Sequence, residues 1–267
     1  MLVQTPTTRP FAVVTGASSG IGLELAKQFA AGGYDVLVAA EDEAVHDVPA
    51  QLAGTVTAEV LRTDLSTREG VEELWRVATA GGRAVDAVAL HAGVGVSGTF
   101  VDTDLEDELQ MVRLNVDAVV RLAKHATRHM VGRGEGRMLF TSSLAARVPA
   151  PHQAVYGASK AFVQSFAQAL RQEVEGAGVV VTTFLPGPTD TEFFDRAGAQ
   201  DTAMGQTSLK DDPAKVAKQA FAALQKGRDH VVTGSLATKV QGAVANLLPN
   251  KLTAKGQGKL AEPGSGD

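Results

Sequence analysis

Hydrophobic and polar positions alternate along this chain in two patterns. Short runs rich in Val, Leu, Ala and Phe predict strands, and several are apolar at nearly every position, as in a parallel sheet buried on both faces. These runs lie at 11–15, 34–39, 56–61, 85–90, 137–142, 179–185 and 230–234. Longer stretches with helical spacing lie at 19–32, 67–80, 104–132, 155–176 and 213–226. The alternation indicates a doubly wound α/β fold.

The chain has no repeat and no low-complexity linker, so we expect one domain over residues 1–267. Its core should cover about 10–235, followed by a C-terminal extension over 236–267 whose last residues should fray. Asp212 and Pro213 are the expected N-cap and first residue of the last core helix. The net charge of -5 argues against a nucleic-acid partner, because such proteins usually present a basic surface.

Cysteine is absent, which excludes disulfides and thiolate metal sites and fits a cytoplasmic protein. The first residues carry no charged segment followed by an apolar run, so we expect no signal peptide. No run approaches the roughly 18 apolar residues of a membrane-spanning helix. We therefore expect a cytoplasmic protein.

A glycine-rich turn, TGASSGIG at 15–22, connects the first strand to the first helix. Its glycines allow a tight turn and a close approach of the backbone to a pyrophosphate, and the helix N-terminus favours negative charge. The spacing is a variant of the dinucleotide-binding fingerprint. Glycines in such a turn also occur for packing reasons alone.

Tyr156 and Lys160 lie four residues apart on a predicted helix and therefore share one face. A nearby ammonium favours the phenolate and lowers the pKa of a tyrosine, which makes proton exchange with a substrate hydroxyl feasible. Ser143 closes the fifth strand thirteen residues before Tyr156, at the sheet edge where ligands bind. The alternatives are an inert surface pair and a serine that satisfies a turn; Ser142 is the competing hydroxyl.

Together these motifs, with a later Pro186-Gly187, resemble the short-chain dehydrogenase/reductase family over about residues 10–235. The resemblance implies a Rossmann-like, seven-stranded parallel sheet of order 3-2-1-4-5-6-7 with helices on both faces. It implies an NAD(P)-dependent oxidoreductase that interconverts a secondary alcohol and a ketone or aldehyde. The segment 186–198 is similar to bacterial members of broad or undefined carbonyl substrate.

The resemblance also assigns roles to four candidate catalytic residues. Tyr156 would be the acid/base, and Ser143 would orient the substrate oxygen. Lys160 would lower the pKa of Tyr156 and hold the nicotinamide ribose. Asn115 would anchor a water that links Lys160 to solvent. Hydride transfer beside Tyr156 requires no metal.

Cofactor contacts are implied along the whole sheet edge. Asp64 would meet the adenine amino group, and the segment 186–191 would orient the nicotinamide carboxamide. The implied contact residues are Gly16, Ser18, Ser19, Gly20, Ile21, Gly22, Glu41, Asp64, Leu65, Ala92, Gly93, Tyr156, Lys160, Pro186, Gly187, Thr189 and Thr191.

One motif departs from the family pattern, because His91 stands where the fourth strand usually ends in a second asparagine. A histidine can form one hydrogen bond through each ring nitrogen. We favour a structural substitute, with a cofactor or substrate contact and a pH-sensitive element as alternatives. His152 is expected at the mouth of the cleft or in an exposed loop.

The end of the second strand bears on which cofactor binds. Ala40 occupies the position where NAD-specific members place an acid, and Glu41 and Asp42 follow. A 2′-phosphate there would meet repulsion without a nearby cation, because no Lys or Arg lies between Lys27 and Arg62. We expect NAD(H) over NADP(H). In one alternative, Arg62 folds back toward the 2′-phosphate. In another, the acids only form a solvated turn at the end of the strand.

The stretch 190–212 is the longest without strand character, and a loop of this length is usually functional. We expect a lid over the substrate, with a surface insertion as the alternative. Phe193, Phe194, Met204 and Val148 suggest an apolar substrate wall.

Surplus apolar residues suggest interfaces. Family members commonly form dimers or tetramers through the two long helices, which here carry Val112, Val116, Val119, Val120, Phe162, Val163, Phe166 and Leu170. A one-sided core face is the alternative. Residues 235–260 contain four lysines and no acid, together with Leu236, Val240, Val244, Leu247 and Leu248 at helical spacing. We expect this segment to pack on the body or on a partner subunit, with membrane contact the less favoured alternative.

Two other functions compete with the oxidoreductase. A catalytically silent NAD(P)-binding regulator or redox sensor would be expected to have lost one of the four candidate catalytic residues, and all four are present. An isomerase or dehydratase of the longer related families usually needs a larger C-terminal substrate domain.

Overall fold

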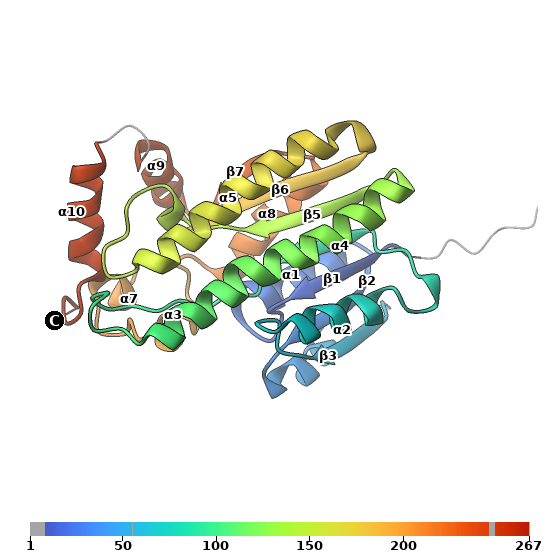
Figure 1. The fold of residues 1–267 in the computed structure, drawn as a ribbon, viewed down its shortest axis with the longest axis horizontal. Coiled ribbons are helices and arrows are strands. Elements are labelled where there is room, and N and C mark those ends of the chain that lie inside the picture. Colours follow the sequence, from blue (N-terminus) through green and yellow to red (C-terminus); the bar gives the residue numbers. More distant parts are fainter. Residues whose placement is uncertain (1–8, 55, 246–248, 267) are drawn as a thin grey trace, which may run out of the picture.

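The computed structural model describes residues 9–54, 56–245 and 249–266. Within them, seven strands form one parallel sheet of order β3-β2-β1-β4-β5-β6-β7, as predicted (Figure 1). The strands are β1 (Phe11–Thr15), β2 (Asp35–Ala40), β3 (Ala58–Arg62), β4 (Ala87–Leu90), β5 (Gly136–Thr141), β6 (Val179–Pro186) and β7 (His230–Thr233).

The observed strand ends differ from the predicted ones by one or two residues because pairing decides them. β3 starts at Ala58 rather than at residue 56, since its register runs from Ala58 opposite Val36 to Arg62 opposite Ala40. The preceding Thr57 donates its backbone N–H to the Asp35 carboxylate instead, at 2.7 Å.

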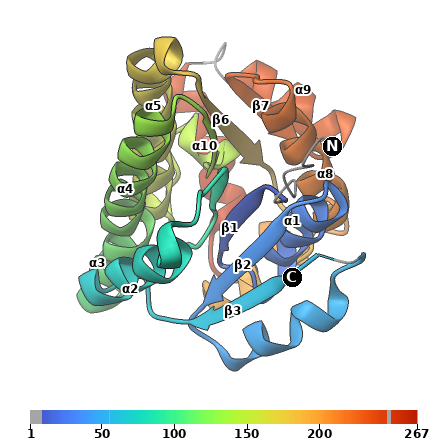
Figure 2. The ribbon, with the colours of Figure 1, turned by 90° about the vertical axis from the view of Figure 1, so that its right-hand side faces the viewer.

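Helices cover both faces of the sheet, as Figure 2 shows. α2, α4 and α5 pack on one face, where Leu74, Leu122 and Val163 join one buried cluster. α1 and α8 cover the other face with Phe29 and Leu224. The helices are α1 (Gly20–Ala31), α2 (Arg68–Ala78), α3 (Leu105–Val112), α4 (Ala118–Arg133), α5 (Ala154–Val174), α6 (Phe193–Arg196), α7 (Ala203–Gln206), α8 (Pro213–Gln225), α9 (Leu236–Ala245) and α10 (Asn250–Ala261).

The single helix expected over 104–132 is wrong in one respect. A π-helical turn, Arg113–Asp117, separates α3 from α4. Such turns are rare and often mark functional sites. This one carries Asn115, whose fully buried side chain hydrogen-bonds the backbone of Val94 from the loop after β4.

The C-terminal extension lies at the same end of the molecule as the start of α5 (Figure 1). The expected fraying of the last residues is wrong, because the tail is hydrogen-bonded to the 190–212 segment. Gly264 N–H donates to the Asp201 carboxylate at 2.9 Å, and Gly266 N–H donates to the Asp201 carbonyl at 2.9 Å. The Ser265 hydroxyl accepts from Ala203 N–H, also at 2.9 Å.

The extension packs on the body of the same chain, as expected, since α9 contacts β7, α10 contacts α7, and Arg147 donates to the Gly242 carbonyl at 2.9 Å. Two residues of its predicted apolar stripe stay exposed. Leu236 and Val240 are 77% and 54% exposed. The Val244 side chain, Leu247 and Leu248 lie outside the described residues. In the part of the chain that the structure describes, no helix is long and apolar enough to cross a membrane.

Candidate active site

A cleft runs along the carboxyl edge of the sheet and brings most of the predicted site residues together. Parallel strands place their C-terminal ends and the following helix starts on one edge, which is why residues 16 to 191 meet there. The predicted cofactor contacts that line the cleft are Gly16, Ser18, Ser19, Gly20, Ile21, Glu41, Leu65, Ala92, Gly93, Tyr156, Lys160, Pro186, Gly187, Thr189 and Thr191.

Two of the predicted contacts, Gly22 and Asp64, are not among the lining residues. A Cβ at Gly22 would lie 1.9 Å from the Gly16 carbonyl oxygen, so Gly22 allows close packing beneath the turn. The Asp64 carboxylate accepts a hydrogen bond from Ser66 N–H at 2.8 Å in an exposed turn. Its contact with adenine stays a prediction, and its neighbour Thr63 lines the cleft.

The glycine-rich turn is fixed by the end of β4. Gly16 has a φ of +65°, and a Cβ there would lie 2.8 Å from the Ala92 Cα, so this position requires glycine on two counts. The Thr15 hydroxyl accepts from the N–H groups of His91 and Ala92 at 3.0 and 3.1 Å and donates to the Ala89 carbonyl. The turn and the strand end are therefore positioned together.

Three hydrogen bonds hold the side chain of Asn115 in place. Its amide donates to the Val94 carbonyl at 2.9 Å and to the Ser159 hydroxyl at 3.1 Å, and its carbonyl accepts from Val94 N–H at 3.0 Å. A Cβ added at Gly93 would lie 2.9 Å from Asn115 Oδ1 and 3.1 Å from Lys160 Nζ. Asn115 and Lys160 thus flank the same backbone position beneath the cleft.

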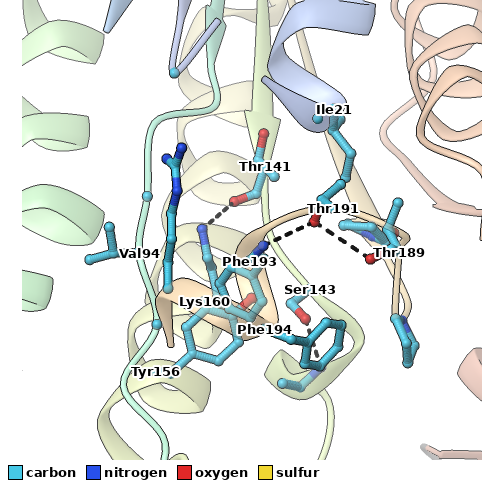
Figure 3. Close-up of a pocket in the computed structure, with 18 of the residues that line it drawn as sticks. Ile21, Val94, Thr141, Ser143, Tyr156, Lys160, Thr189, Thr191, Phe193 and Phe194 are labelled. Atoms are coloured by element: carbon cyan, nitrogen blue, oxygen red, sulfur yellow. Dashed lines mark hydrogen bonds between the residues drawn. The ribbon is translucent and has the colours of Figure 1, made fainter. Parts of the chain in front are cut away.

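Tyr156 and Lys160 start α5 on its inward face, and Ser143 approaches them from the end of β5 (Figure 3). Tyr156 and Lys160 are 9% and 6% exposed. Lys160 Nζ donates to the Thr141 carbonyl at 3.4 Å and lies 5.8 Å from the centroid of the Tyr156 ring. Ser143 lines the cleft together with both residues.

The net shift of the pKa of Tyr156 is upward in this structure, and a lowering by Lys160 stays a prediction. Burial raises the pKa of Tyr156 to about 12, and the Ser143 hydroxyl acts in the opposite direction. Burial also lowers the pKa of Lys160 to about 8, because an enclosed ammonium loses hydration. At neutral pH the tyrosine is a phenol, which is the form that donates a proton.

The competing hydroxyl, Ser142, has a different position. It is 1% exposed, and its hydroxyl donates to the Lys160 carbonyl at 2.9 Å. Ser143 begins a short helical turn as its N-cap and accepts from Ala145 N–H at 3.2 Å. Its hydroxyl therefore serves the turn and faces Tyr156 as well.

His91 takes up a structural position at the back of the cleft. Its Nδ1 lies 3.1 Å from the Thr141 hydroxyl, and its ring stacks on Phe184 with the centroids 6.4 Å apart. Burial and the charge of Lys160 lower the pKa of His91 to about 3. The imidazole is therefore neutral at physiological pH. These contacts favour the structural reading, and since His91 also lines the cleft, cofactor contact stays open.

The adenosine end of the cleft holds one cation that the local sequence did not predict, Arg196, beside Arg62, which folds back toward it. Arg196, from the 190–212 segment, places a guanidinium nitrogen 3.8 Å from Asp42 Oδ2. Arg62 donates to the Glu41 carbonyl at 2.8 Å and pairs with the Glu43 carboxylate. The expectation of no nearby cation is therefore wrong, because Arg196 arrives from a distant part of the chain.

The 190–212 segment covers the cleft and supplies its apolar wall. Figure 3 shows Phe193 and Phe194 beside Tyr156, with the Phe193 ring centroid 5.2 Å from that of Tyr156. Phe194 packs with Ala197 and Ala199, and Met204 and Val148 also line the cleft as predicted.

Other lining residues were not predicted. Gln153, which is 5% exposed, lies three residues before Tyr156, so helical spacing from the tyrosine was an available signal. Thr253, Gln257 and Leu260 of α10 had no local signal. His152 is not among the lining residues. It has a φ of 62°, and its carbonyl accepts from Gly98 N–H.

The residues present fit a dinucleotide. The turn at Gly16 leads into the N-terminus of α1, whose free N–H groups suit a pyrophosphate. Asp42 Oδ1 is buried and has no hydrogen-bond partner among the described residues, so an acceptor remains for a ribose hydroxyl. Tyr156, Lys160, Thr189 and Thr191 would hold the nicotinamide end.

Comparisons with known proteins agree with this geometry. The family model of short chain dehydrogenases matches residues 10–202. The uncharacterized short-chain type dehydrogenase/reductase y4eK of Sinorhizobium fredii is 33% identical over 214 residues, which cover 80% of this chain and 82% of that protein.

Solved structures are similar as well. A short-chain dehydrogenase from Sphingobium yanoikuyae in complex with NADPH has a TM-score of 0.78 and 27% identity, covering 84% of this chain and 87% of that one. The 3-ketoacyl-(acyl-carrier-protein) reductase from Brucella melitensis complexed with NADH has a TM-score of 0.74 and 25% identity, covering 85% and 97%.

Proposed function

The chain belongs to the short-chain dehydrogenase/reductase family of NAD(P)-dependent oxidoreductases, and on that premise we propose that it interconverts a ketone or aldehyde and an alcohol with Tyr156 as acid/base. The observation that carries the proposal is the enclosed phenol of Tyr156, which lies in one cleft with Ser143 and has Lys160 Nζ 5.8 Å from its ring centroid. Ser143 follows β5, and Tyr156 and Lys160 lie near the start of α5, so the carboxyl edge of the sheet positions all three side chains.

The proposed reduction divides its work between the cofactor and the protein. When bound, the nicotinamide supplies the hydride to the carbonyl carbon. Tyr156 donates its phenolic proton to the carbonyl oxygen, so the product is a neutral alcohol. Ser143 donates a hydrogen bond to the same oxygen and orients it. Oxidation runs through the same groups in reverse, with Tyr156 accepting the proton.

Lys160 and Asn115 support the proton transfer from behind. An ammonium at Lys160 stabilises negative charge on the tyrosine oxygen after it has given up its proton. With the pKa of Lys160 lowered to about 8, the lysine is also able to pass a proton on near neutral pH. Asn115 fixes the backbone of Val94 beside Gly93, the position that Lys160 Nζ also approaches.

We propose NADH as the preferred cofactor. Glu41 and Asp42 both line the adenosine end, and Asp42 is already oriented by the Ser18 hydroxyl, which donates to Oδ2 at 2.8 Å. A carboxylate there accepts the ribose hydroxyls of NAD and repels the phosphate of NADP. The substrate we propose is partly apolar, because Phe193, Phe194 and Met204 line its side of the cleft.

Calorimetric titration with NADH and NADPH tests this preference. Wild-type protein should bind NADH more tightly, and Glu41→Arg should shift the preference toward NADPH by about tenfold, since it replaces repulsion by an ion pair with the phosphate. Tighter binding of NADPH by the wild type would contradict the proposal.

The catalytic role is tested by Tyr156→Phe on any carbonyl substrate found by screening with NADH. Turnover should fall by about 10²–10⁴-fold, because general acid catalysis is lost. Tyr34→Phe is the matched control: the other tyrosine of the chain packs against Phe29 and Phe221, away from the cleft. It should retain wild-type turnover. Full activity of Tyr156→Phe would overturn the mechanism.

A further inference from the structure

The short helix α6 reaches both ends of the cleft. Phe193 and Arg196 are three residues apart on it, so they project from one side. Phe193 lies on Tyr156, with ring centroids 5.2 Å apart. The Arg196 guanidinium lies 3.8 Å from Asp42 at the adenosine end. One helical turn therefore contacts the proposed catalytic tyrosine and the acid proposed to bind the adenosine ribose.

The two arginines near Asp42 have different partners. Arg62 is engaged by the Glu43 carboxylate and the Glu41 carbonyl. Within the described ranges, Arg196 is the one basic side chain that pairs with Asp42. The Arg196 guanidinium also pairs with Glu192, the N-cap residue of α6, at 2.7 Å.

The remaining contacts of α6 and its flanks with the opposite wall are apolar or made by the backbone. The Thr191 methyl group packs at Gly20, where an added Cβ would lie 2.9 Å away. The Phe193 ring packs at Gly95 in the same manner, at 2.6 Å. Ser97 N–H donates to the Ala197 carbonyl at 2.9 Å. The ion pair between Arg196 and Asp42 is therefore the charged contact between this segment and the adenosine end.

We propose that Arg196 is a specificity-determining residue that couples closure of the 190–212 segment over Tyr156 to the adenosine end of the cofactor. This deepens the proposed function and rests on it. With a free 2′-hydroxyl on the ribose, Arg196 stays paired with Asp42 and the segment is closed. A 2′-phosphate adds negative charge beside Asp42 and Glu41, and Arg196 is the cation available to neutralise it. Binding of NADPH therefore depends on Arg196 more than binding of NADH does.

Proteolysis of the cofactor-free protein tests the coupling without turnover. Chymotrypsin cuts after Phe193 and Phe194, and Phe194 is 5% exposed when the segment is closed. Arg196→Gln and Asp42→Asn should each accelerate these cuts about threefold, as expected for loss of a partly exposed ion pair, with fragments identified by mass spectrometry. The double variant should be no faster than either single one, because both remove the same contact.

Arg76→Gln is the matched control, since it removes an exposed arginine of α2 that pairs with Glu73. It should be cut at the wild-type rate. Additive acceleration in the double variant, or an unchanged rate in Arg196→Gln, would overturn the coupling.

Fluorescence titration with NADH and NADPH tests specificity. Arg196→Gln should weaken NADPH binding by about tenfold and NADH binding by less than about threefold, because a phosphate contact of a guanidinium is stronger than an exposed ion pair. Equal weakening of both cofactors would overturn the inference. Failure of the wild type to bind either cofactor would instead overturn the proposed function, so the two failures are distinguishable.

Discussion

Among single residues, His91 is the one whose charge the fold controls most directly. An asparagine at this position would be neutral at every pH, whereas a histidine half-buried beside Lys160 is held in its neutral form. Stacking on Phe184 and the contact with Thr141 suit the neutral ring. His91 therefore affects the stability of the fold in acid and does not act as a switch at physiological pH.

We predict that His91 makes the protein sensitive to acid. Below pH 6.5 the unfolded chain protonates this histidine, and the folded chain does not until the pH approaches about 3, so the free energy of unfolding falls as the pH falls through this window. At pH 5 the loss amounts to about 2 kcal/mol. Urea unfolding at pH 7 and pH 5 should show a difference smaller by this amount in His91→Asn.

His230→Asn is the control, because this histidine is exposed at the start of β7. It should retain the wild-type dependence on pH. An equal dependence in His91→Asn and the wild type would show that His91 is not the group responsible.

At the scale of elements, the neighbouring residues Asp211 and Asp212 at the start of α8 make different kinds of contact. Asp212 caps α8 by accepting from Ala214 N–H at 2.9 Å, as predicted from the Asp-Pro pair. Asp211 is 5% exposed and accepts from Ser235 N–H and the Thr238 hydroxyl, both at 2.6 Å. Its backbone also pairs with Thr189. Asp211 thus joins the end of the 190–212 segment to the start of α9.

We predict that these two aspartates differ in their contribution to stability. Asp212→Ala removes a cap at an exposed helix start and should lower the free energy of unfolding by about 1 kcal/mol. Asp211→Ala removes the hydrogen bonds from the partly buried Ser235 N–H and the buried Thr238 hydroxyl and should cost about 2–3 kcal/mol. Urea unfolding of both variants measures the difference, and equal losses would contradict the role of Asp211.

At the scale of the whole molecule, the two long helices divide their apolar residues between core and surface. Val119, Val163 and Leu170 are buried against the sheet, so the one-sided core face accounts for them. Phe162 is 40% exposed and stacks on Phe166, with centroids 5.8 Å apart, and Val112 is 36% exposed. These exposed residues of α3 and α5 support a homo-oligomer, which we propose.

We predict that Phe162→Asp weakens this assembly. A charge in the middle of an apolar contact is costly to bury, whereas at an exposed position of the free subunit it is tolerated. Sedimentation velocity should show a shift toward monomer with unchanged circular dichroism. Lys218→Asp, a charge change on α8, is the control. A wild-type monomer at micromolar concentration would contradict the proposal.

Local patterns in the sequence predicted most of the strands and helices of the fold. Apolar strand runs and helical spacing located the seven strands and the five main helices, because burial on a sheet imposes those periods directly. The π-helical turn at Asn115 escaped prediction, since the Asn115 side chain bonds a backbone segment that is 21 residues away in sequence. The hydrogen-bonded tail at Gly264 escaped for the same reason.

By itself, the sequence determined the sheet order and the set of groups at its edge, through motifs whose spacing matches a known family and whose chemistry is local. The tertiary structure alone decided their electrostatics. It raised the pKa of Tyr156 through burial where the sequence predicted lowering, and it brought Arg196 to Asp42 across more than 150 residues. Charge interactions depend on distance and hydration in space, and spacing along the chain encodes neither.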